Sequence, residues 1–398
     1  MTAPIEIDQA YLRDTLLHLL AIPSPCGFTD EIVHYVGRCL NELDVPYDLT
    51  RRGTIRATLQ GKEDSPDRAV VSHLDTIGAM VRRIKSDGRI LVSPIGRWSS
   101  RFAEGVRVTL FSDNGVFRGT LLPDVRWGCS GDQGVDQPVS SWDTVFLRLD
   151  APAFSEQEVR DLGIDVGNYI ALEPQPEFLD NGFLVSRHLD NKAGTATVLA
   201  AIKWLREHQV ELPLSCHPLF TITEIAGTGS AGALFPDVSE LVTVDFASLH
   251  SFTREAVMGV TLALQDASGP FDYHLTHHLL RLCREQTIPV HTTLLNAHHN
   301  DSSAAIVAGH DVRTAVITCG GHAAHSIERV HMESLCNVAR LLVNYLRSKP
   351  VFHRDPQVMT TLDAFPHQVD AGRMPHNDTQ LPRPDKLFTE NGGDGGDA

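Results

Sequence analysis

Ser186-Arg187-His188-Leu189-Asp190-Asn191-Lys192-Ala193-Gly194 is the stretch of this 398-residue chain that decides its fold. An apolar run over residues 182–188 predicts a strand, which passes through a turn at Asp190 directly into a predicted helix. In open α/β sheets, ligands bind outside the carboxyl ends of the strands. The stretch therefore predicts an α/β fold with a functional carboxylate at Asp190.

Three further candidate metal ligands follow predicted strands in the same way. His73, Glu224 and Asp245 each close a short apolar segment with strand-like composition. A single histidine in such a place is usually a buried polar group with a hydrogen-bond partner. Four potential ligands at four strand ends instead favour one common site, and we expect the four side chains to converge on it.

The composition predicts a soluble globular protein of the cytoplasm. A chain of 398 residues with 42% hydrophobic content can bury a large core and favours two or three structural units. No apolar run approaches the roughly 18 to 20 residues of a membrane span, and the N-terminus lacks a signal-peptide pattern. The seven scattered cysteines include no C-x-x-C pair, so neither a disulfide framework nor a thiolate zinc site is indicated.

The net charge argues against two classes of partner. The formal charge is -16, which repels both nucleic-acid phosphates and anionic lipid. We therefore expect no nucleic acid and no membrane among the partners of this protein.

Periodicity and turn signals divide the chain into four parts. Residues 1–78 carry two predicted helices, capped by Asp8 and Thr29, and then two predicted strands. Residues 79–180 form an all-β unit, either a small β-barrel or a sandwich, because short alternating segments are separated by Gly-containing turns. These segments are 80–84, 89–95, 106–111, 116–122, 144–149 and 166–172.

The α/β pattern returns after the all-β unit. Residues 181–350 alternate between predicted strands and helices, so the all-β unit is an insertion into one catalytic domain. His73 and Asp75 lie before the insertion, and the other candidate residues lie after it. Residues 351–398 are rich in Pro, Asp, Gly and Asn, and we expect this tail to be disordered.

The candidate ligands suit divalent-metal chemistry. A set of His, Asp and Glu without Cys is typical of zinc, cobalt or manganese. A carboxylate that bridges two such ions offsets their repulsion at about 3.5 to 4 Å, and the pair generates hydroxide at neutral pH. A further carboxylate is then needed to move the proton from water to the leaving amine. Glu224 fits that role as a general base.

Several blocks also resemble a known family. They are His73-Leu74-Asp75-Thr76-Ile77-Gly78, Leu162-Gly163-Ile164-Asp165-Val166-Gly167-Asn168 and Leu189-Asp190-Asn191-Lys192-Ala193-Gly194. In this order they are similar to the M42 metallo-aminopeptidases, which include glutamyl and deblocking aminopeptidases. The resemblance runs over roughly residues 8–347. It implies a zinc-peptidase-like three-layer domain with an inserted small β-barrel for dimerisation, two divalent metals, and dimers that assemble into a dodecamer.

The resemblance also implies roles for individual residues. It makes His73 and Asp245 terminal metal ligands and Asp190 the carboxylate that bridges the metals. It makes His325, in the block His325-Ser326-Ile327-Glu328, the last ligand, and Asp75 a residue that orients His73.

One position departs from the family pattern. The family has E-E-V-G, in which the first Glu is the general base and the second a ligand, whereas this chain has Glu224-Ile225-Ala226-Gly227. Either Glu224 stays the base and one metal loses a ligand, or Glu224 becomes the ligand and Thr223 takes the place of the base. The centre is therefore expected to hold one or two cations per chain, zinc or cobalt first and manganese next.

Other side chains could assist a depleted second metal. The candidates are His322, His299 and Asp301, while the run from His298 to Asp301 could equally be a loop that caps the site. Residues 223–230 also resemble the M42 subfamily in bacterial gene sets for the osmoprotectant N-acetylglutaminylglutamine amide. That resemblance implies a small peptide or peptide amide as substrate.

Three functions follow from these patterns. The first is a metal-dependent aminopeptidase that acts on small peptides as a homo-oligomer. The second is an amidase or deacylase acting on a blocked dipeptide amide, because a lost ligand changes where a free α-amine can bind. The third is an assembly protein whose catalysis is impaired.

Overall fold

The computed structural model describes residues 5–124, 140–249 and 253–352, together with residues 355, 361, 362, 365, 366 and 368. Backbone contacts group the chain into Met1–Pro356 and Gln357–Ala398. Most of the predicted tail, residues 351–398, lies outside the described residues, so its predicted disorder stays a prediction. Within the described part, no helix is both long and apolar enough to cross a membrane.

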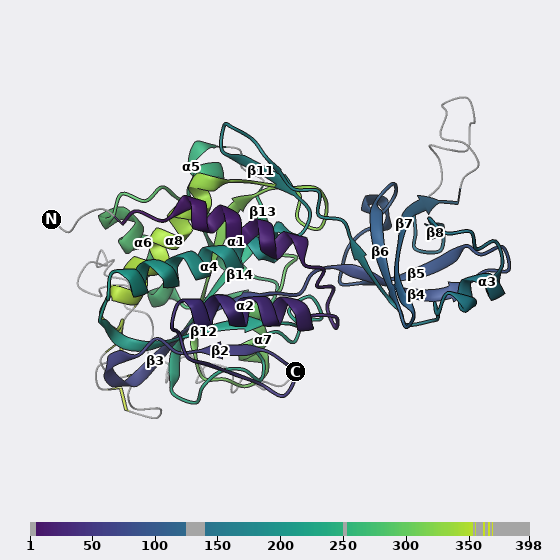
Figure 1. Cartoon of the computed structure of the whole chain (residues 1–398). Coiled ribbons are helices and arrows are strands. Elements are labelled where there is room, and N and C mark those ends of the chain that lie inside the picture. Colours follow the sequence, from purple (N-terminus) through teal and green to yellow (C-terminus); the bar gives the residue numbers. More distant parts are fainter. Residues whose placement is uncertain are drawn as a thin grey trace, which may run out of the picture. The chain divides into compact units, whose positions relative to one another are not determined.

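A nine-stranded mixed sheet forms the centre of the fold. Four strands run parallel: β12 (Leu212–Thr221), β3 (Gly61–His73), β13 (Val238–Ser248) and β17 (Arg313–Gly321). The outer strands are β1 (Tyr47–Leu49) and β2 (Ile55–Ala57) at one edge, and β14 (Val260–Asp266), β15 (Gly269–Pro270) and β16 (Val290–Leu294) at the other. Because the four central strands of the sheet (Figure 1) are parallel, their carboxyl ends lie at the same end of the sheet.

Alternation along the strands separates the two faces of this sheet. Val70, Val242 and Val244 belong to the large core on one face, whereas Val71 and Leu241 belong to a smaller core on the other. The first face is covered by α1 (Gln9–Ala21), α2 (Asp30–Glu42), α4 (Leu189–Glu207), α6 (Tyr273–Glu285) and α8 (Met332–Arg347). The second face is covered by the short α7 (Asp301–Val307). The predicted three-layer α/β domain is confirmed, with one thin layer.

The inserted all-β unit is a closed antiparallel barrel, which decides between the barrel and the sandwich. Its strand order is β4 (Gly78–Ile84), β5 (Ile90–Ile95), β8 (Val145–Leu149), β7 (Gly115–Pro123), β6 (Arg107–Ser112) and β9 (Tyr169–Leu172). The barrel has its own core, which includes Val92, Leu110 and Leu147. The helical turn η1 (Ser100–Phe102) and the helix α3 (Glu156–Asp161) connect its strands, and Ser155 caps α3.

Three expectations about strand ends need correction. The strand before Asp190, β11 (Phe183–Ser186), pairs with β10 (Glu177–Phe178) and β18 (Glu328–His331) in a separate small sheet. Glu224 lies beyond the end of β12, and Asp245 lies inside β13. The short helix α5 (Arg254–Met258) precedes β14.

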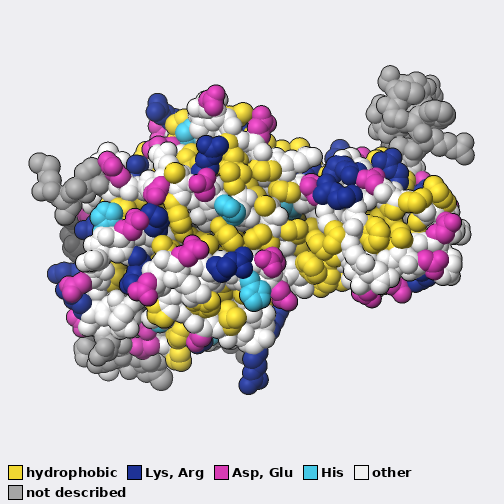
Figure 2. Space-filling view, in the orientation of Figure 1, with side chains coloured by type: hydrophobic (Ala, Val, Ile, Leu, Met, Phe, Trp, Pro, Cys, Tyr) yellow, Lys and Arg dark blue, Asp and Glu magenta, His cyan; other side chains and the backbone are white. Residues whose placement is uncertain are grey.

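The surface of the helices carries both signs of charge. In the view of Figure 2, acidic and basic side chains are interspersed with apolar ones over this face. On this face the acidic side chains are therefore not gathered into one block.

A buried ion pair joins two central strands to the end of α8. Arg68 on β3 donates from Nε to Glu240 Oε2 on β13 at 2.9 Å, and both side chains are at most 1% exposed. The other guanidinium nitrogens donate to the carbonyl oxygens of Tyr345, Ser348 and Lys349 at 2.9 Å each. All three guanidinium nitrogens of Arg68 thus take part in fixing the end of α8 on the sheet.

We predict that Arg68→Ala lowers the free energy of unfolding by about 3 to 5 kcal/mol, because it leaves Glu240 buried without its partner. Urea denaturation followed by circular dichroism measures the change. The control is Arg38→Ala, which removes the ion pair with Glu31 whose side chains are 58% and 68% exposed, and which should cost under about 1 kcal/mol. Equal effects of the two substitutions would contradict a structural role for the buried pair.

Candidate metal centre

Strand register brings His73 and Asp245 together. The parallel pair β3 and β13 sets Val71 opposite Thr243, which carries His73 level with Asp245 two residues later. Along their strands, His73 and Asp245 alternate with residues whose side chains face α4, so their own side chains lie on the other face of the sheet, which α7 covers. Thr243 lies on that same face, and its hydroxyl is 2.7 Å from that of Ser302 on α7. Two potential ligands thus lie side by side on adjacent strands.

Asp190 reaches the same place from the opposite face. The next residue, Asn191, donates from Nδ2 to Ser72 Oγ at 3.1 Å and to the Val244 carbonyl at 2.7 Å. Ser72 and Val244 directly precede His73 and Asp245 in their strands. This amide therefore fixes the start of α4 over the sheet edge, next to the two ligands.

Glu328 is a buried residue to which the sequence reasoning gave no role. Its carboxylate accepts the backbone N–H of Asp190 at 3.0 Å and the backbone N–H of His325 at 2.9 Å. Burial and the neighbouring charge of Asp190 raise the pKa of Glu328 to about 8. One side chain thus positions two candidate ligands that are distant in sequence. The spacing of three residues between His325 and Glu328 is the signal that could have found it.

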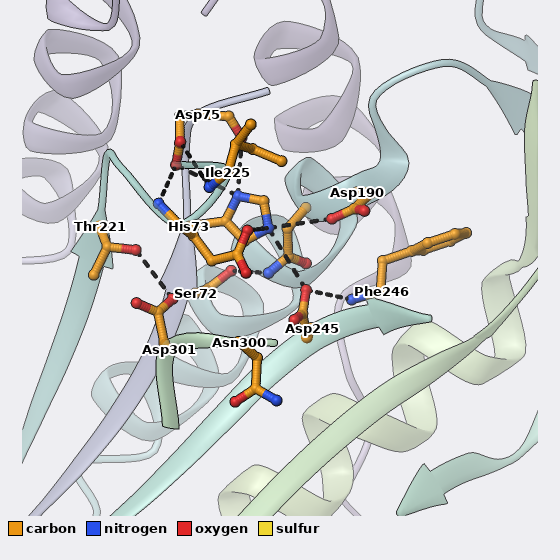
Figure 3. Close-up of polar contacts among 12 residues, drawn as sticks. Ser72, His73, Asp75, Asp190, Thr221, Ile225, Asp245, Phe246, Asn300 and Asp301 are labelled. Atoms are coloured by element: carbon orange, nitrogen blue, oxygen red, sulfur yellow. Dashed lines mark hydrogen bonds and ion pairs between the residues drawn. The ribbon is translucent and has the colours of Figure 1, made fainter. Parts of the chain in front are cut away.

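All five side chains predicted for the centre converge, as Figure 3 shows for those that it labels. Asp190 lies between the two histidines, with Oδ1 3.1 Å from His73 Nε2 and Oδ2 3.3 Å from His325 Nε2. Glu224 Oε2 and Asp245 Oδ1 are each 3.6 Å from His73 Nε2. The convergence is a feature of the structure, and the separate roles of these residues stay predictions.

The histidine tautomers are those of metal ligands. His73 Nδ1 is 2.9 Å from the Asp75 carbonyl oxygen, and His325 Nδ1 is 2.9 Å from the Arg97 carbonyl oxygen. A carbonyl oxygen only accepts, so each Nδ1 carries a proton and each Nε2 of a neutral ring presents a lone pair. A lone pair that faces carboxylates is unfavourable unless a proton or a metal cation lies between them.

A divalent cation fits one group of these residues. The ligand atoms of His73, Asp190 and Asp245 all lie within 4.8 Å of one another. Ligands about 2.0 to 2.1 Å from a tetrahedral zinc lie about 3.3 Å apart, and the observed distances of 3.1 and 3.6 Å from His73 Nε2 are close to that value. Such a cation lowers the pKa of water and polarises a carbonyl oxygen.

The electrostatics of the centre also favour a cation. Burial alone would lower the pKa of His73, but Glu224, Asp190 and Asp245 outweigh it and hold the pKa well above its usual value. Burial likewise opposes protonation of His325, yet Asp190 raises its pKa to about 9. Desolvation and the charge of Asp245 raise the pKa of Glu224. The shifts of the two histidines reflect the negative charge that surrounds them.

Asp75 fixes the segment that carries Glu224. Its fully buried carboxylate accepts the backbone N–H of Glu224 at 3.2 Å and that of Ile225 at 3.1 Å. Its Oδ1 is also 3.6 Å from His73 Nδ1, although the hydrogen bond of that nitrogen goes to the Asp75 carbonyl. Asp75 therefore acts mainly on the backbone at residues 224 and 225.

The other side chains that could assist a second metal lie in different places in the structure. Asp301 is fully buried, and its Oδ2 accepts from Thr221 Oγ1 at 3.1 Å. His298 and His299 are exposed and line a cavity beside the centre. His322 lies within hydrogen-bond reach of Arg329, at 3.4 Å. Asp301 and His322 are absent from the described lining of that cavity, whereas the two exposed histidines are part of its wall.

This cavity of about 630 Å³ opens onto the centre. Asp190, Glu224, Asp245 and His325 form one wall of it. Much of the remaining lining is small or apolar, and it includes Ala231, Phe246, Leu295, Ala304 and Val307. A volume in this range accommodates a small organic ligand.

Comparison with known proteins identifies the family. The sequence profile described as M42 glutamyl aminopeptidase matches residues 53–341. The Bacillus subtilis protein YhfE is 32% identical over 339 residues, which are 85% of this chain and 98% of YhfE. The chain belongs to the M42 family. It is accordingly an aminopeptidase of the metallo-hydrolase class.

Further known proteins are similar to this chain in sequence or in fold. The glutamyl aminopeptidase of Lactococcus lactis is 28% identical over 51% of this chain and 57% of its own length. The crystal structure of a TET aminopeptidase from a marine sediment thaumarchaeote superposes with a TM-score of 0.77 at 18% identity, covering 84% of this chain and 96% of that one. The TET1 peptidase of Pyrococcus horikoshii gives a TM-score of 0.73 at 18% identity, over 84% and 99% of the two chains. The fold of this M42 protein is thus that of the TET aminopeptidases.

We predict that Asp190→Ala abolishes cation binding, because it removes the carboxylate that lies between both histidines. Zinc bound after gel filtration, measured by inductively coupled plasma mass spectrometry, should fall to background. The control is Asp14→Ala at an exposed position of α1, which should leave the zinc content unchanged. Retention of zinc by a folded Asp190→Ala variant would contradict the position of the centre.

Proposed function

We propose that this M42 protein removes the N-terminal residue of short peptides, using a divalent cation held by His73, Asp190 and Asp245 and using Glu224 as general base. The observation that carries the proposal is the approach of three carboxylates to Nε2 of one buried histidine, His73. This group faces a cavity of about 630 Å³, which is a suitable size for a small peptide.

The protein residues divide the chemistry between them. The cation supplies an acidic water and a polarised carbonyl oxygen. Glu224 is placed to accept a proton from the attacking water and to pass it to the leaving amine. Asp75 holds Glu224 in place through the backbone, and Asn191 and Glu328 hold the segment that bears Asp190.

An oligomer is the expected form of the active protein. The Pyrococcus horikoshii TET1 peptidase can assemble into a tetrahedron or a large octahedral shell. The inserted barrel, residues 79–180 in the predicted division, is proposed as the part of this chain that makes such contacts. The finer likeness of residues 223–230 to the osmoprotectant subfamily also stays a proposal, and it would make the substrate a peptide amide.

We predict that Glu224→Gln keeps its bound zinc but loses about 10²- to 10⁴-fold in kcat, because the amide cannot accept a proton. Release of the N-terminal residue from a dipeptide with a free amine measures turnover, and metal analysis of the same sample is the control. Full activity of Glu224→Gln would refute the assignment of the base.

A second substrate separates the aminopeptidase from the amidase. Wild-type protein should cleave a peptide with a free α-amine and leave its N-acetyl form intact. The reverse preference would replace the aminopeptidase by a deacylase or amidase at the same centre. Failure on both substrates, with zinc bound, would favour the assembly protein.

Arg97 gives the cavity a cation that can bind the substrate. Its carbonyl oxygen is fixed by His325 Nδ1 at 2.9 Å, its exposed side chain lines the cavity, and it forms no ion pair with a carboxylate of the described residues. A guanidinium in this place matches a carboxylate. We propose that it binds the terminal carboxylate of a dipeptide or tripeptide.

We predict that Arg97→Ala raises KM about 10- to 100-fold for a dipeptide with a free carboxylate, which is the loss of one charge-assisted contact. The KM for the corresponding dipeptide amide should change little. Arg101→Ala, an exposed neighbour that does not line the cavity, is the control. If Arg97→Ala instead raises KM only for a peptide amide with an N-terminal Glu, then Arg97 binds the acidic side chain of the substrate and not its terminal carboxylate.

A further inference from the structure

The centre contains two unequal positions for a cation. We call the place between His73 Nε2, Asp190 Oδ1 and Asp245 the first position, and the place between Asp190 Oδ2 and His325 Nε2 the second position. Three ligand atoms surround the first, all within 4.8 Å of one another. Within the described part of the chain, His325 belongs to no such group of three. The second position therefore has two protein ligands, 3.3 Å apart.

Ile225 is the reason for the missing ligand. The M42 pattern has a carboxylate here, but this side chain is aliphatic and packs against the core of the barrel. If Gly96 had a Cβ atom, that atom would lie 2.6 Å from Ile225 Cγ2 and 3.1 Å from Ile77 Cγ2, both closer than an ordinary contact. Gly96 has no side chain, and this leaves the space that Ile225 fills. The residue is thus committed to apolar packing.

The backbone cannot shift Glu224 into the place of Ile225. Asp75 accepts from the N–H groups of both residues and fixes their register. On the amino side, the Thr223 hydroxyl accepts from Thr228 Oγ1 at 2.9 Å, and the Thr223 carbonyl accepts the N–H of Gly229 at 3.0 Å. Of the two alternatives for this segment, the geometry supports Glu224 as base rather than Thr223.

The neighbouring polar side chains do not supply the missing ligand. Glu224 turns toward the first position, 3.6 Å from His73 Nε2. Asp301 packs against the backbone of Gly229: its Oδ1 is only 2.1 Å from the place where a Cβ of that residue would be. His299 directs Nδ1 to Ser268 Oγ at 3.0 Å.

We propose that this protein binds one divalent cation firmly, at the first position, and that the second position binds a cation at least about 10-fold more weakly. The estimate is a lower bound, because loss of even an outer partner of a ligand costs about 10- to 100-fold in affinity. The inference rests on the proposed function for its metal centre. According to this proposal, Ile225 determines how many cations each chain binds tightly.

The test is a titration of the full-length protein, freed of metal by a chelator, with Co²⁺ or Zn²⁺. Isothermal titration calorimetry and metal analysis after gel filtration should give one tight equivalent for the wild type. Ile225→Glu supplies the absent carboxylate and should bind two tight equivalents. Ile225→Gln is the matched control, because it introduces a polar group of the same size without the charge, and it should keep one tight equivalent.

A second pair of variants tests the inference even if Ile225→Glu fails to fold. His325→Ala should retain the tight equivalent with nearly unchanged affinity, whereas Asp245→Asn should lose it. The absorption spectrum of bound Co²⁺ reports the ligand set independently of activity.

The outcomes separate this inference from the proposed function. Two equivalents of equal affinity in the wild type, or loss of the tight equivalent in His325→Ala, would overturn the unequal centre and leave the metallo-aminopeptidase standing. Absence of any tight equivalent in the wild type would overturn both.

Discussion

Repulsion among buried carboxylates is the constraint on which the rest of this structure depends. Asp190, Glu224 and Asp245 all approach His73 Nε2, while Nδ1 of the same ring contacts a carbonyl oxygen on its other side. In a site with little water, such charges are tolerated only with a positive charge among them. The arrangement is therefore stable as a cation site.

The fold holds these charges in place mainly through the backbone. Glu328 binds the peptide N–H groups of Asp190 and His325, Asp75 binds those of Glu224 and Ile225, and Asn191 binds the carbonyl of Val244. The ligand oxygens are thereby left facing the centre. Outer contacts of this kind orient metal ligands and are part of the site, because a small misplacement of a ligand weakens both binding and catalysis.

The barrel insertion and the metal centre meet at one residue. Ile225 follows the base directly in sequence, yet its side chain contributes to the apolar surface beside Ile77 and Gly96. A carboxylate at position 225 could bind a cation, whereas the aliphatic side chain that is present packs against the core of the barrel. One position cannot do both, because a buried charge without a partner is unfavourable in an apolar environment. This choice distinguishes the chain from the pattern of the family to which it belongs.

The sequence by itself determined the classes of element, the insertion of an all-β unit into an α/β domain, and the five side chains of the centre. Periodicity and turn residues carry that information locally, and motif blocks carry the family. The tertiary structure decided that Asp190 enters from a small separate sheet, that Glu328 fixes two ligands, that Ile225 packs on the barrel, and that Arg97 faces the cavity. These features depend on strand register and on contacts between segments far apart in the chain, which no local pattern of residues encodes.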